Sequence, residues 1–468
     1  MVFSTLTFLF CFFPLVFILY YLRPNRVYRN TVLLIFSLIF YGWGEPKFIL
    51  LMLAASLVAY IGGLGMQRFE ETNRPKAKKV TFIITSTLLI ANLFVFKYLN
   101  FFVANINLLF PKTELVTNLV LPIGISFYTF QILSYVIDLY RKKIGVQRNY
   151  FYLTLYLAFF PQLIAGPIVR YETVENEIHT RKETLDDVVC GMRRFIVGMA
   201  KKVIIANNTG AIATAIYSGD KEIYGMPFYW IAAIAYALQI YFDFSGYSDM
   251  AIGLGRMFGF HFLENFDYPY IATSITNFWR RWHISLSSWF RDYVYIPLGG
   301  NRVPKHRWIF NICVVWALTG FWHGASWNFV LWGVYFAALL LLEKFLLHKL
   351  LDKLPKFICW LYTFVLILVS WVIFNLTDFS QMLSVLRHMF SLRFTDPVNA
   401  VLTDTSILYG LFYIPLGILC MFPWVKKFRP KKTALSEFVL NSVSIVLFGV
   451  SICFTIASTY NPFIYFRF

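Results

Sequence analysis

Residues Phe321-Trp-His-Gly-Ala-Ser-Trp-Asn328 place one histidine between two apolar stretches, 308–320 and 325–347. An ionisable side chain inside a bilayer is costly, so a residue of this kind is a functional candidate by default. Histidine also takes up and releases a proton near neutral pH. The alternative is a core histidine that has only a structural role and forms hydrogen bonds with its neighbours. The stretch predicts a helical membrane protein and marks His323 as a candidate general base.

Apolar stretches recur along nearly the whole chain. The protein has 468 residues, of which 59% are hydrophobic and 14% are charged, whereas soluble domains carry about 25% charged residues. A crossing helix needs about 20 apolar residues, and several stretches are shorter or broken by Gly or Pro, so we expect an all-α polytopic protein with about 11 crossings. The stretches lie near 4–22, 31–43, 47–66, 80–96, 118–140, 151–166, 188–206, 226–242, 308–320, 325–347, 357–374, 404–422 and 436–458.

The pattern predicts one integral membrane domain over 1–468. It would comprise N-terminal helices (1–150), a catalytic core (151–347) and C-terminal helices (348–468). Residues 4–22 lack a charged leader and are predicted to be a retained first span. Short basic segments are typical of cytoplasmic loops, and five of them carry this signal: Arg23 to Arg29, Arg68 to Lys79, Arg141 to Arg148, Arg302 to Arg307 and Lys426 to Lys432.

The net charge of +18 would suggest nucleic acid in a soluble protein. Here the basic residues lie in short loops, so we expect no nucleic acid, and membrane lipid headgroups are the simple partners. The more specific alternative is that the basic residues bind an anionic substrate, such as a nucleotide-bearing thioester. The six cysteines form no CxxC pair, so no metal site is expected.

Several enzyme classes lack their motifs. The chain contains no Walker loop, dinucleotide fingerprint, HExxH pair or GxSxG elbow. We therefore expect no bound cofactor, and direct transfer assisted by a histidine base is the simplest chemistry.

The polar segment 261–306 is either a surface loop or the wall of a cavity. If residues 277–292 form one helix, Trp279, Trp282, His283 and Leu286 share a face, flanked by Arg280 and Arg281. Indole rings line apolar grooves and arginine binds phosphate, so this face suits a ligand with an acyl arm and a phosphorylated handle. The alternative is an interfacial helix with tryptophan belts and snorkelling arginines.

Two carboxylates, Asp243 and Asp249, lie in otherwise apolar sequence. They are candidates for substrate binding. The alternative is a structural role, in which they pair with nearby arginines such as Arg256 or cap helix ends. Gly246 between them predicts a break or a close backbone approach.

Linked motifs then resemble a known family. They are Asp243-Phe-Ser-Gly-Tyr-Ser-Asp-Met, Glu264-Asn-Phe-Asp-Tyr-Pro-Tyr, Phe278-Trp-Arg-Arg-Trp-His-Ile-Ser, Arg291-Asp-Tyr-Val-Tyr-Ile-Pro-Leu-Gly-Gly-Asn-Arg and Gly320-Phe-Trp-His-Gly-Ala-Ser-Trp-Asn. In this order they resemble the membrane-bound O-acyltransferase (MBOAT) superfamily. Met1-Val-Phe-Ser, Leu163-Ile-Ala-Gly-Pro167 and Asn461-Pro-Phe-Ile-Tyr-Phe are similar to its bacterial alginate O-acetylation branch.

The resemblance implies a ring of about 11 helices around a central funnel, with re-entrant or interfacial helices, in the bacterial cytoplasmic membrane. It implies that His323 matches the catalytic histidine and His283 a second histidine linked to activity. The donor would be a cytoplasmic thioester, acetyl-CoA in this branch. The acceptor would be an exported polysaccharide, reached directly or through an extracytoplasmic acyltransferase partner. His283, Trp327 and Asn328 are candidates for stabilising the oxyanion.

Three alternatives remain open at this point. A sister branch transfers D-alanine from a carrier protein to teichoic acid, but there the Arg-Asp-Tyr motif is usually not followed by Ile296-Pro-Leu-Gly-Gly-Asn-Arg302. A transporter would also carry polar intramembrane residues. A scaffold for polymer export would tolerate point changes at both histidines.

Overall fold

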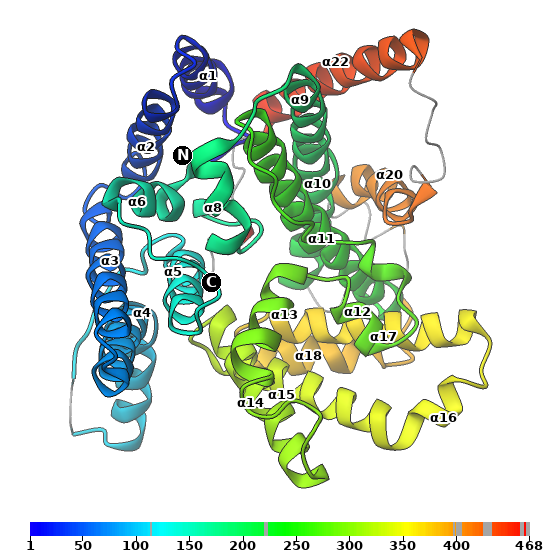
Figure 1. The fold of residues 1–468 in the computed structure, drawn as a ribbon. Helices are drawn as coiled ribbons and strands as arrows, with labels where there is room; N and C mark the ends of the chain where they lie inside the picture. The colour runs from blue at the N-terminus through cyan, green and yellow to red at the C-terminus, as the bar shows by residue number, and fades with distance from the viewer. Residues whose placement is uncertain are drawn as a thin grey trace. The chain divides into compact units, whose positions relative to one another are not determined.

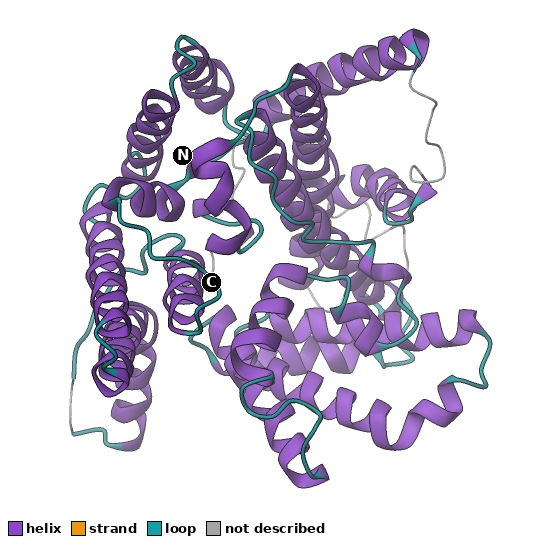
Figure 2. Ribbon diagram, viewed as in Figure 1, coloured by secondary structure: helices purple, strands orange, loops and turns teal. Residues whose placement is uncertain are grey.

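The computed structural model describes residues 1–112, 115–219, 223–395, 398, 405–424, 433–458 and 463–464. Throughout this part of the chain, helices alternate with loops and no strand is present (Figure 2). The all-helical class predicted from the sequence is therefore confirmed for it. The basic segment Lys426 to Lys432 and part of the Asn461 to Phe466 motif fall outside the described residues.

The chain divides into two compact units, residues 1–195 with 250–263 and residues 196–249 with 264–468. The expected single domain with three parts stays a prediction. In the first unit, α3 packs against α4 and α5. Its elements are η1 (Phe8–Phe12), α1 (Phe13–Tyr21), α2 (Arg26–Gly42), α3 (Ile49–Glu71), α4 (Pro75–Leu109), α5 (Ile125–Tyr140), α6 (Tyr150–Ala158), α7 (Phe160–Leu163) and α8 (Tyr171–Thr180) (Figure 1).

A buried carboxylate joins the start of α2 to the loop after α8 in this unit. Glu183 accepts hydrogen bonds from Arg26, at 2.6 Å, and Arg29, at 2.7 Å. Tyr20 also donates to it, and Arg181 lies 3.5 Å away. Burial alone would raise the pKa of Glu183, but the hydrogen bonds from Arg26 and Tyr20 and the guanidinium charges outweigh it and lower the pKa.

Two helices run across the division, α9 (Leu185–Ala200) and α11 (Met226–Met257). The second unit adds η2 (Lys201–Ala206), α10 (Asn207–Ser218), η3 (Pro269–Ile271), α12 (Ile275–Trp279), α13 (Ile284–Phe290), η4 (Arg291–Tyr295), α14 (Lys305–His323), α15 (Trp327–Leu342), η5 (Glu343–Leu347), α16 (His348–Leu351), α17 (Lys356–Asn375), α18 (Phe379–Met389), α20 (Thr405–Cys420) and α22 (Ala434–Ala457).

Two glycines let α14 and α15 cross closely. A Cβ on Gly333 would lie 2.5 Å from the carbonyl oxygen of Trp316, and one on Gly320 would overlap the carbonyl of Phe329. At Gly324, just after α14, the aromatic ring of Phe329 fills the space where a Cβ would lie. This crossing fixes the end of α14, where His323 lies.

Five helices among the described residues are long and apolar enough to cross a membrane. They span Ile49–Glu71, Pro75–Leu109, Trp327–Leu351, Lys356–Asn375 and Ala434–Ala457. A polytopic membrane protein is thus confirmed, whereas the expected count of crossings and their ring arrangement are not. Other predicted stretches form helices too, but 151–166 is divided between α6 and α7.

Two local predictions need correction or sharpening. The single helix expected over 277–292 is wrong, because α12 ends at Trp279 and α13 begins at Ile284. Between them His283 takes a left-handed conformation with φ of 44°. Gly246 does not break α11. It provides the close approach instead, since a Cβ there would lie 2.6 Å from the carbonyl oxygen of Gly198.

Candidate active site

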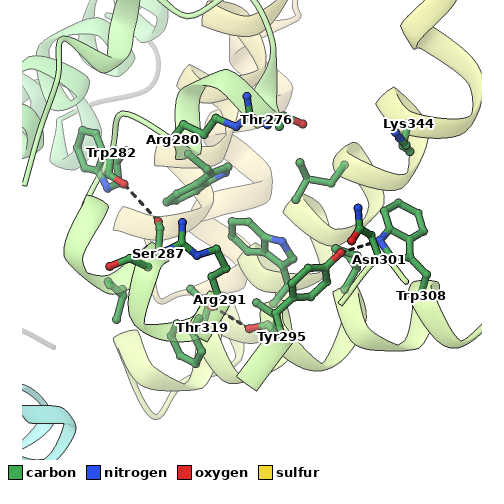
Figure 3. Close-up of a pocket in the computed structure, with 18 of the residues that line it drawn as sticks. Thr276, Arg280, Trp282, Ser287, Arg291, Tyr295, Asn301, Trp308, Thr319 and Lys344 are labelled. Carbon is green, nitrogen blue, oxygen red and sulfur yellow. Dashed lines mark hydrogen bonds between the residues drawn. The ribbon is translucent and has the colours of Figure 1, made fainter. Parts of the chain in front are cut away.

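A cavity of about 1020 Å³ opens in the second unit (Figure 3). Its lining comes from α12, α13, η4, α14 and the far end of the Trp327–Leu351 helix. Seven aromatic side chains form much of the wall: Trp279, Trp282, Phe290, Tyr295, Trp308, Trp316 and Phe345. Both His283 and His323 line this cavity. The volume is at the upper end for a small-molecule site.

His323 is the last residue of α14 and is 3% exposed. Aromatic rings surround the imidazole edge to face. The ring centroids of Trp332, Trp322 and Phe374 lie 5.0, 5.1 and 5.2 Å from its own. Tight packing of this kind holds a side chain in one rotamer. The imidazole is therefore fixed in place beside the cavity.

His283 is 1% exposed and is held by Asn265. The Asn265 Oδ1 atom lies 3.1 Å from Nδ1 of His283. It also accepts from the hydroxyl of Ser285, at 2.8 Å, and from its backbone N–H. Because a backbone N–H can only donate, the shared atom is the amide oxygen, and Nδ1 of His283 carries the proton. In the neutral ring Nε2 then has the lone pair.

The two histidines share a neighbour. The indole of Trp322 lies 5.8 Å from the ring of His283 and 5.1 Å from that of His323. His283 belongs to the 261–306 segment, outside the candidate spans. Burial, and then the neighbouring His323, lower the pKa of His283 well below its usual range. A neutral imidazole is the form that can accept a proton.

The three other members of the predicted helical face also reach the cavity, although the helix itself is broken. Trp279, Trp282 and Leu286 all line it. Trp279 packs edge to face against Trp316 at 4.8 Å, and Trp282 stacks on Phe278 at 5.5 Å. The turn between α12 and α13 thus presents these side chains where a continuous helix was expected to do so.

Four cations form what we call the cationic rim: Arg280, Arg291, Lys305 and Lys344. All four are exposed. No aspartate or glutamate is among the described residues that line the cavity. Arg291 pairs with Asp292 at 2.7 Å, and that carboxylate lies off the lining. The rim therefore favours an anionic group at the mouth and an apolar one deeper inside.

Other predicted site residues do not reach the cavity. Arg281 forms an ion pair with Asp267 at 3.1 Å. Asp243 and Asp249 pair with lysines of η2, Lys202 and Lys201, each at 2.6 Å. Their partners are lysines and not the arginines expected from the sequence.

The three candidate oxyanion donors differ in whether they lie at the cavity. Asn328 donates its amide to the carbonyls of Ile373 and Phe374, at 3.3 and 3.0 Å, and so joins α15 to α17. Trp327 is 52% exposed and is not in the lining. Of the three candidates only His283 is at the cavity.

Sequence reasoning missed Asn265, Lys305, Lys344 and Arg291 as site residues. Asn265 lies inside the Glu264 to Tyr270 motif, which was the available signal. The two lysines carry no such signal, since basic residues at span ends occur throughout the chain.

Comparisons with known proteins identify the family of the chain. The model of the MBOAT, membrane-bound O-acyltransferase family, matches residues 139–395. The chain is 37% identical to the probable alginate O-acetylase of Pseudomonas putida over the full length of both proteins. It is 41% identical to that of Azotobacter vinelandii over 87% of this chain and 82% of the relative.

The chain is also similar to the peptidoglycan O-acetyltransferase of Helicobacter pylori. The two are 31% identical over 100% of this chain and 98% of the relative. Matches of this extent establish the family, and the two buried histidines lie within the matched region. The chain belongs to the membrane-bound O-acyltransferase family and is an O-acyltransferase.

Proposed function

We propose that this protein moves an acetyl group from a cytoplasmic thioester, acetyl-CoA, toward an exported cell-surface polysaccharide. The observation that carries the proposal is one aromatic cavity that both buried histidines line, with the four cations of the cationic rim and no aspartate or glutamate among its described lining residues. A phosphorylated donor has the charge that such a rim attracts. Its acyl arm suits the aromatic wall.

The proposed chemistry needs one base. The acceptor hydroxyl oxygen attacks the thioester carbonyl carbon, and His323 takes the hydroxyl proton. The new C–O bond forms as the C–S bond breaks, and the proton on His323 passes to the leaving thiolate. Base assistance of this kind typically contributes about 10²–10⁴-fold.

The relatives support this acceptor, because they are named as an alginate O-acetylase and a peptidoglycan O-acetyltransferase. The polymer is reached directly or through an extracytoplasmic acyltransferase partner. Placement in the bacterial cytoplasmic membrane, and about 11 crossings around a funnel, belong to the same proposal. D-alanyl transfer from a carrier protein is an outcome that the donor test below distinguishes.

The decisive experiment follows acetyl transfer from labelled acetyl-CoA in purified membrane vesicles. Replacing His323 with Ala should lower turnover by about 10²–10⁴-fold at equal protein level. Full activity of His323→Ala would remove this residue from the mechanism. Activity with a D-alanyl carrier and none with acetyl-CoA would replace the proposed donor.

The cationic rim makes a second prediction. Replacing Arg280 or Lys344 with Ala should raise the KM for acetyl-CoA roughly three- to tenfold, which corresponds to at most about 1.4 kcal/mol for an exposed charge. The matched control is Lys79→Ala, which removes the same charge from an exposed position outside the cavity. An equal rise in KM for Lys79→Ala would mean that overall charge, not the rim, attracts the donor.

A further inference from the structure

Asp243 holds a segment that is distant in the sequence. Its Oδ2 atom accepts a hydrogen bond from the backbone N–H of Ile464 at 2.7 Å, while Oδ1 lies 2.6 Å from Nζ of Lys202. Asp243, Lys202 and Ile464 are 1%, 4% and 3% exposed. A buried ion pair by itself contributes little net stability. The backbone N–H of Ile464 adds a hydrogen bond to the second carboxylate oxygen of Asp243.

The residue before Ile464 packs on the same face of α11. The ring of Phe463, 1% exposed, lies 4.6 Å from Tyr247 and 6.2 Å from Phe244. Residues 463–464 thus contact three residues of α11. Ile464 bonds to Asp243, and Phe463 packs on Phe244 and Tyr247. The backbone is held by the carboxylate and the side chain by the two rings.

Phe244 connects this contact to the candidate active site. Its ring lies edge to face against the imidazole of His283, at 4.6 Å and 88°. It also packs against Phe266 at 5.0 Å, and Phe266 stacks beside His283 at 6.4 Å. Phe463 therefore packs against Phe244, which in turn packs against His283. Phe463 is not among the residues that line the cavity.

We propose that residues 463–464 are a positioning element for His283, anchored by Asp243 and acting through Phe244. This role deepens the proposed function and rests on it, because the consequence is read as acyl transfer. The pair Asp249 and Lys201 offers a matched control. It has the same 2.6 Å separation, and Asp249 lies on the same helix as Asp243, α11, while the backbone N–H of Ile464 donates to Asp243.

The first test measures docking without relying on activity. Position 464 is changed to cysteine, which keeps its backbone N–H, and maleimide labelling is resolved by mass spectrometry in the full-length protein. Labelling at 464 should be slow, should rise at least tenfold when Asp243→Ala is added, and should stay slow with Asp249→Ala. Equal labelling in the two backgrounds would overturn the anchoring role of Asp243.

The second test removes the backbone N–H donor of residue 464. Ile464→Pro lacks the backbone N–H, whereas Ile464→Ala keeps it and removes more of the side chain. We expect Ile464→Pro to lower kcat at least tenfold per folded protein with the KM for acetyl-CoA within twofold, because the cationic rim is untouched. Ile464→Ala should stay within threefold of the wild-type kcat.

The outcomes separate the two proposals. If Ile464→Pro matches Ile464→Ala in kcat, or raises KM in parallel, the positioning role is wrong while the proposed function stands. If Ile464→Pro does not accumulate, Phe463→Leu, which keeps the anchor and reduces the ring contact with Phe244, should lower kcat at unchanged KM, and an unchanged kcat there would also overturn the role. A wild-type protein inactive with acetyl-CoA would refute the proposed donor, and the labelling result would still decide the docking.

Discussion

At the scale of single residues, His283 is held in a conformation that its neighbours must maintain. A non-glycine residue with positive φ costs roughly 1–2 kcal/mol. Asn265 stabilises this conformation through both its backbone and its side chain. Its carbonyl accepts from Ile284 N at 2.9 Å, and its Oδ1 contacts His283 Nδ1 at 3.1 Å. The side chain thus sets the tautomer, and the backbone fixes the turn.

Replacing Asn265 with Ala should lower kcat roughly ten- to hundredfold, because a lost buried hydrogen bond costs about 1–3 kcal/mol and each 1.4 kcal/mol changes a rate tenfold. Acetyl transfer in vesicles measures the effect. Asn301→Ala is a suitable control, since Asn301 lines the same cavity but is exposed and remote from the His283 contacts. Equal losses in both variants would mean that Asn265 has no special role in orienting His283.

The two histidines could be identified from the sequence because a polar ring in apolar sequence stands out by composition alone. The role of Asn265 could not be assigned, because it depends on tertiary hydrogen bonds between residue 265 and residues 283–285. Asp243 was singled out for the same reason as the histidines. Its actual neighbours, Lys202 and Ile464, are too far along the chain for spacing to reveal.

At the scale of elements, the short helix α12 depends on a carboxylate from another part of the second unit. Glu343 is 5% exposed. It accepts from the backbone N–H groups of Ile275, at 2.7 Å, and Thr276, at 3.2 Å. The N-cap Ser274 accepts from Asn277 at 3.0 Å. These bonds satisfy the first three donors of a helix of five residues, which leads directly into Arg280.

Replacing Glu343 with Ala should destabilise α12 by about 0.5–2 kcal/mol, the usual cost of a lost cap, and raise the KM for acetyl-CoA through displaced Trp279 and Arg280. Glu343→Gln keeps an acceptor oxygen and should recover most of the loss. Steady-state kinetics on both variants tests this. If Glu343→Gln is as impaired as Glu343→Ala, the negative charge matters and not the cap.

The break between α12 and α13 could not be predicted from the periodicity of 277–292. The apolar positions fit one helical face, and neither glycine nor proline interrupts the run. The turn is imposed by tertiary contacts, in which Asp267 N bonds Arg281 O and Ile284 N bonds Asn265 O, each at 2.9 Å. Long apolar helices such as α17 were predictable, because hydropathy alone determines them.

The crossing of α14 and α15 makes a further prediction at this scale. Gly333→Ala places a Cβ against the Trp316 carbonyl, and overpacking of this kind typically costs about 1–3 kcal/mol. Because the crossing positions His323, we expect lower kcat together with a lower Tm. The control is Gly449→Ala in α22, where nothing lies within 4 Å of the added carbon. A Tm for Gly333→Ala equal to that of Gly449→Ala would show that the crossing accommodates a methyl group.

At the scale of the whole molecule, composition predicted the class and the many helices, since a bilayer requires apolar segments with internally paired backbones. The number of crossings did not follow, because length and hydropathy are not sufficient for shorter helices such as α10 and α20. The division into two compact units was also not predicted. α11 runs through it without a break in sequence, and the first unit is completed by residues 250–263.

The ionic cluster of the first unit predicts how stability depends on pH. The pKa of Glu183 lies below its ordinary value of 4.5 in the folded protein, because Arg26 and Tyr20 donate to it. A carboxyl with a lowered folded pKa stabilises the fold fully above its unfolded value, and this contribution is lost as pH falls through the folded pKa. The groups that face it are Tyr20, Arg26, Arg29 and Arg181.

The Tm difference between wild type and Glu183→Gln in detergent should therefore be largest near neutral pH and should shrink as pH falls below about 4.5. Removing one partner of a buried ion pair costs about 3–5 kcal/mol, which is an upper limit here because glutamine retains hydrogen bonds. Glu172→Gln, at an exposed position of the same unit, should show little difference at any pH. A Glu183→Gln difference that is constant from neutral to acidic pH would mean that the ionised carboxylate contributes nothing to this cluster, and that its hydrogen bonds alone join α2 to the loop after α8.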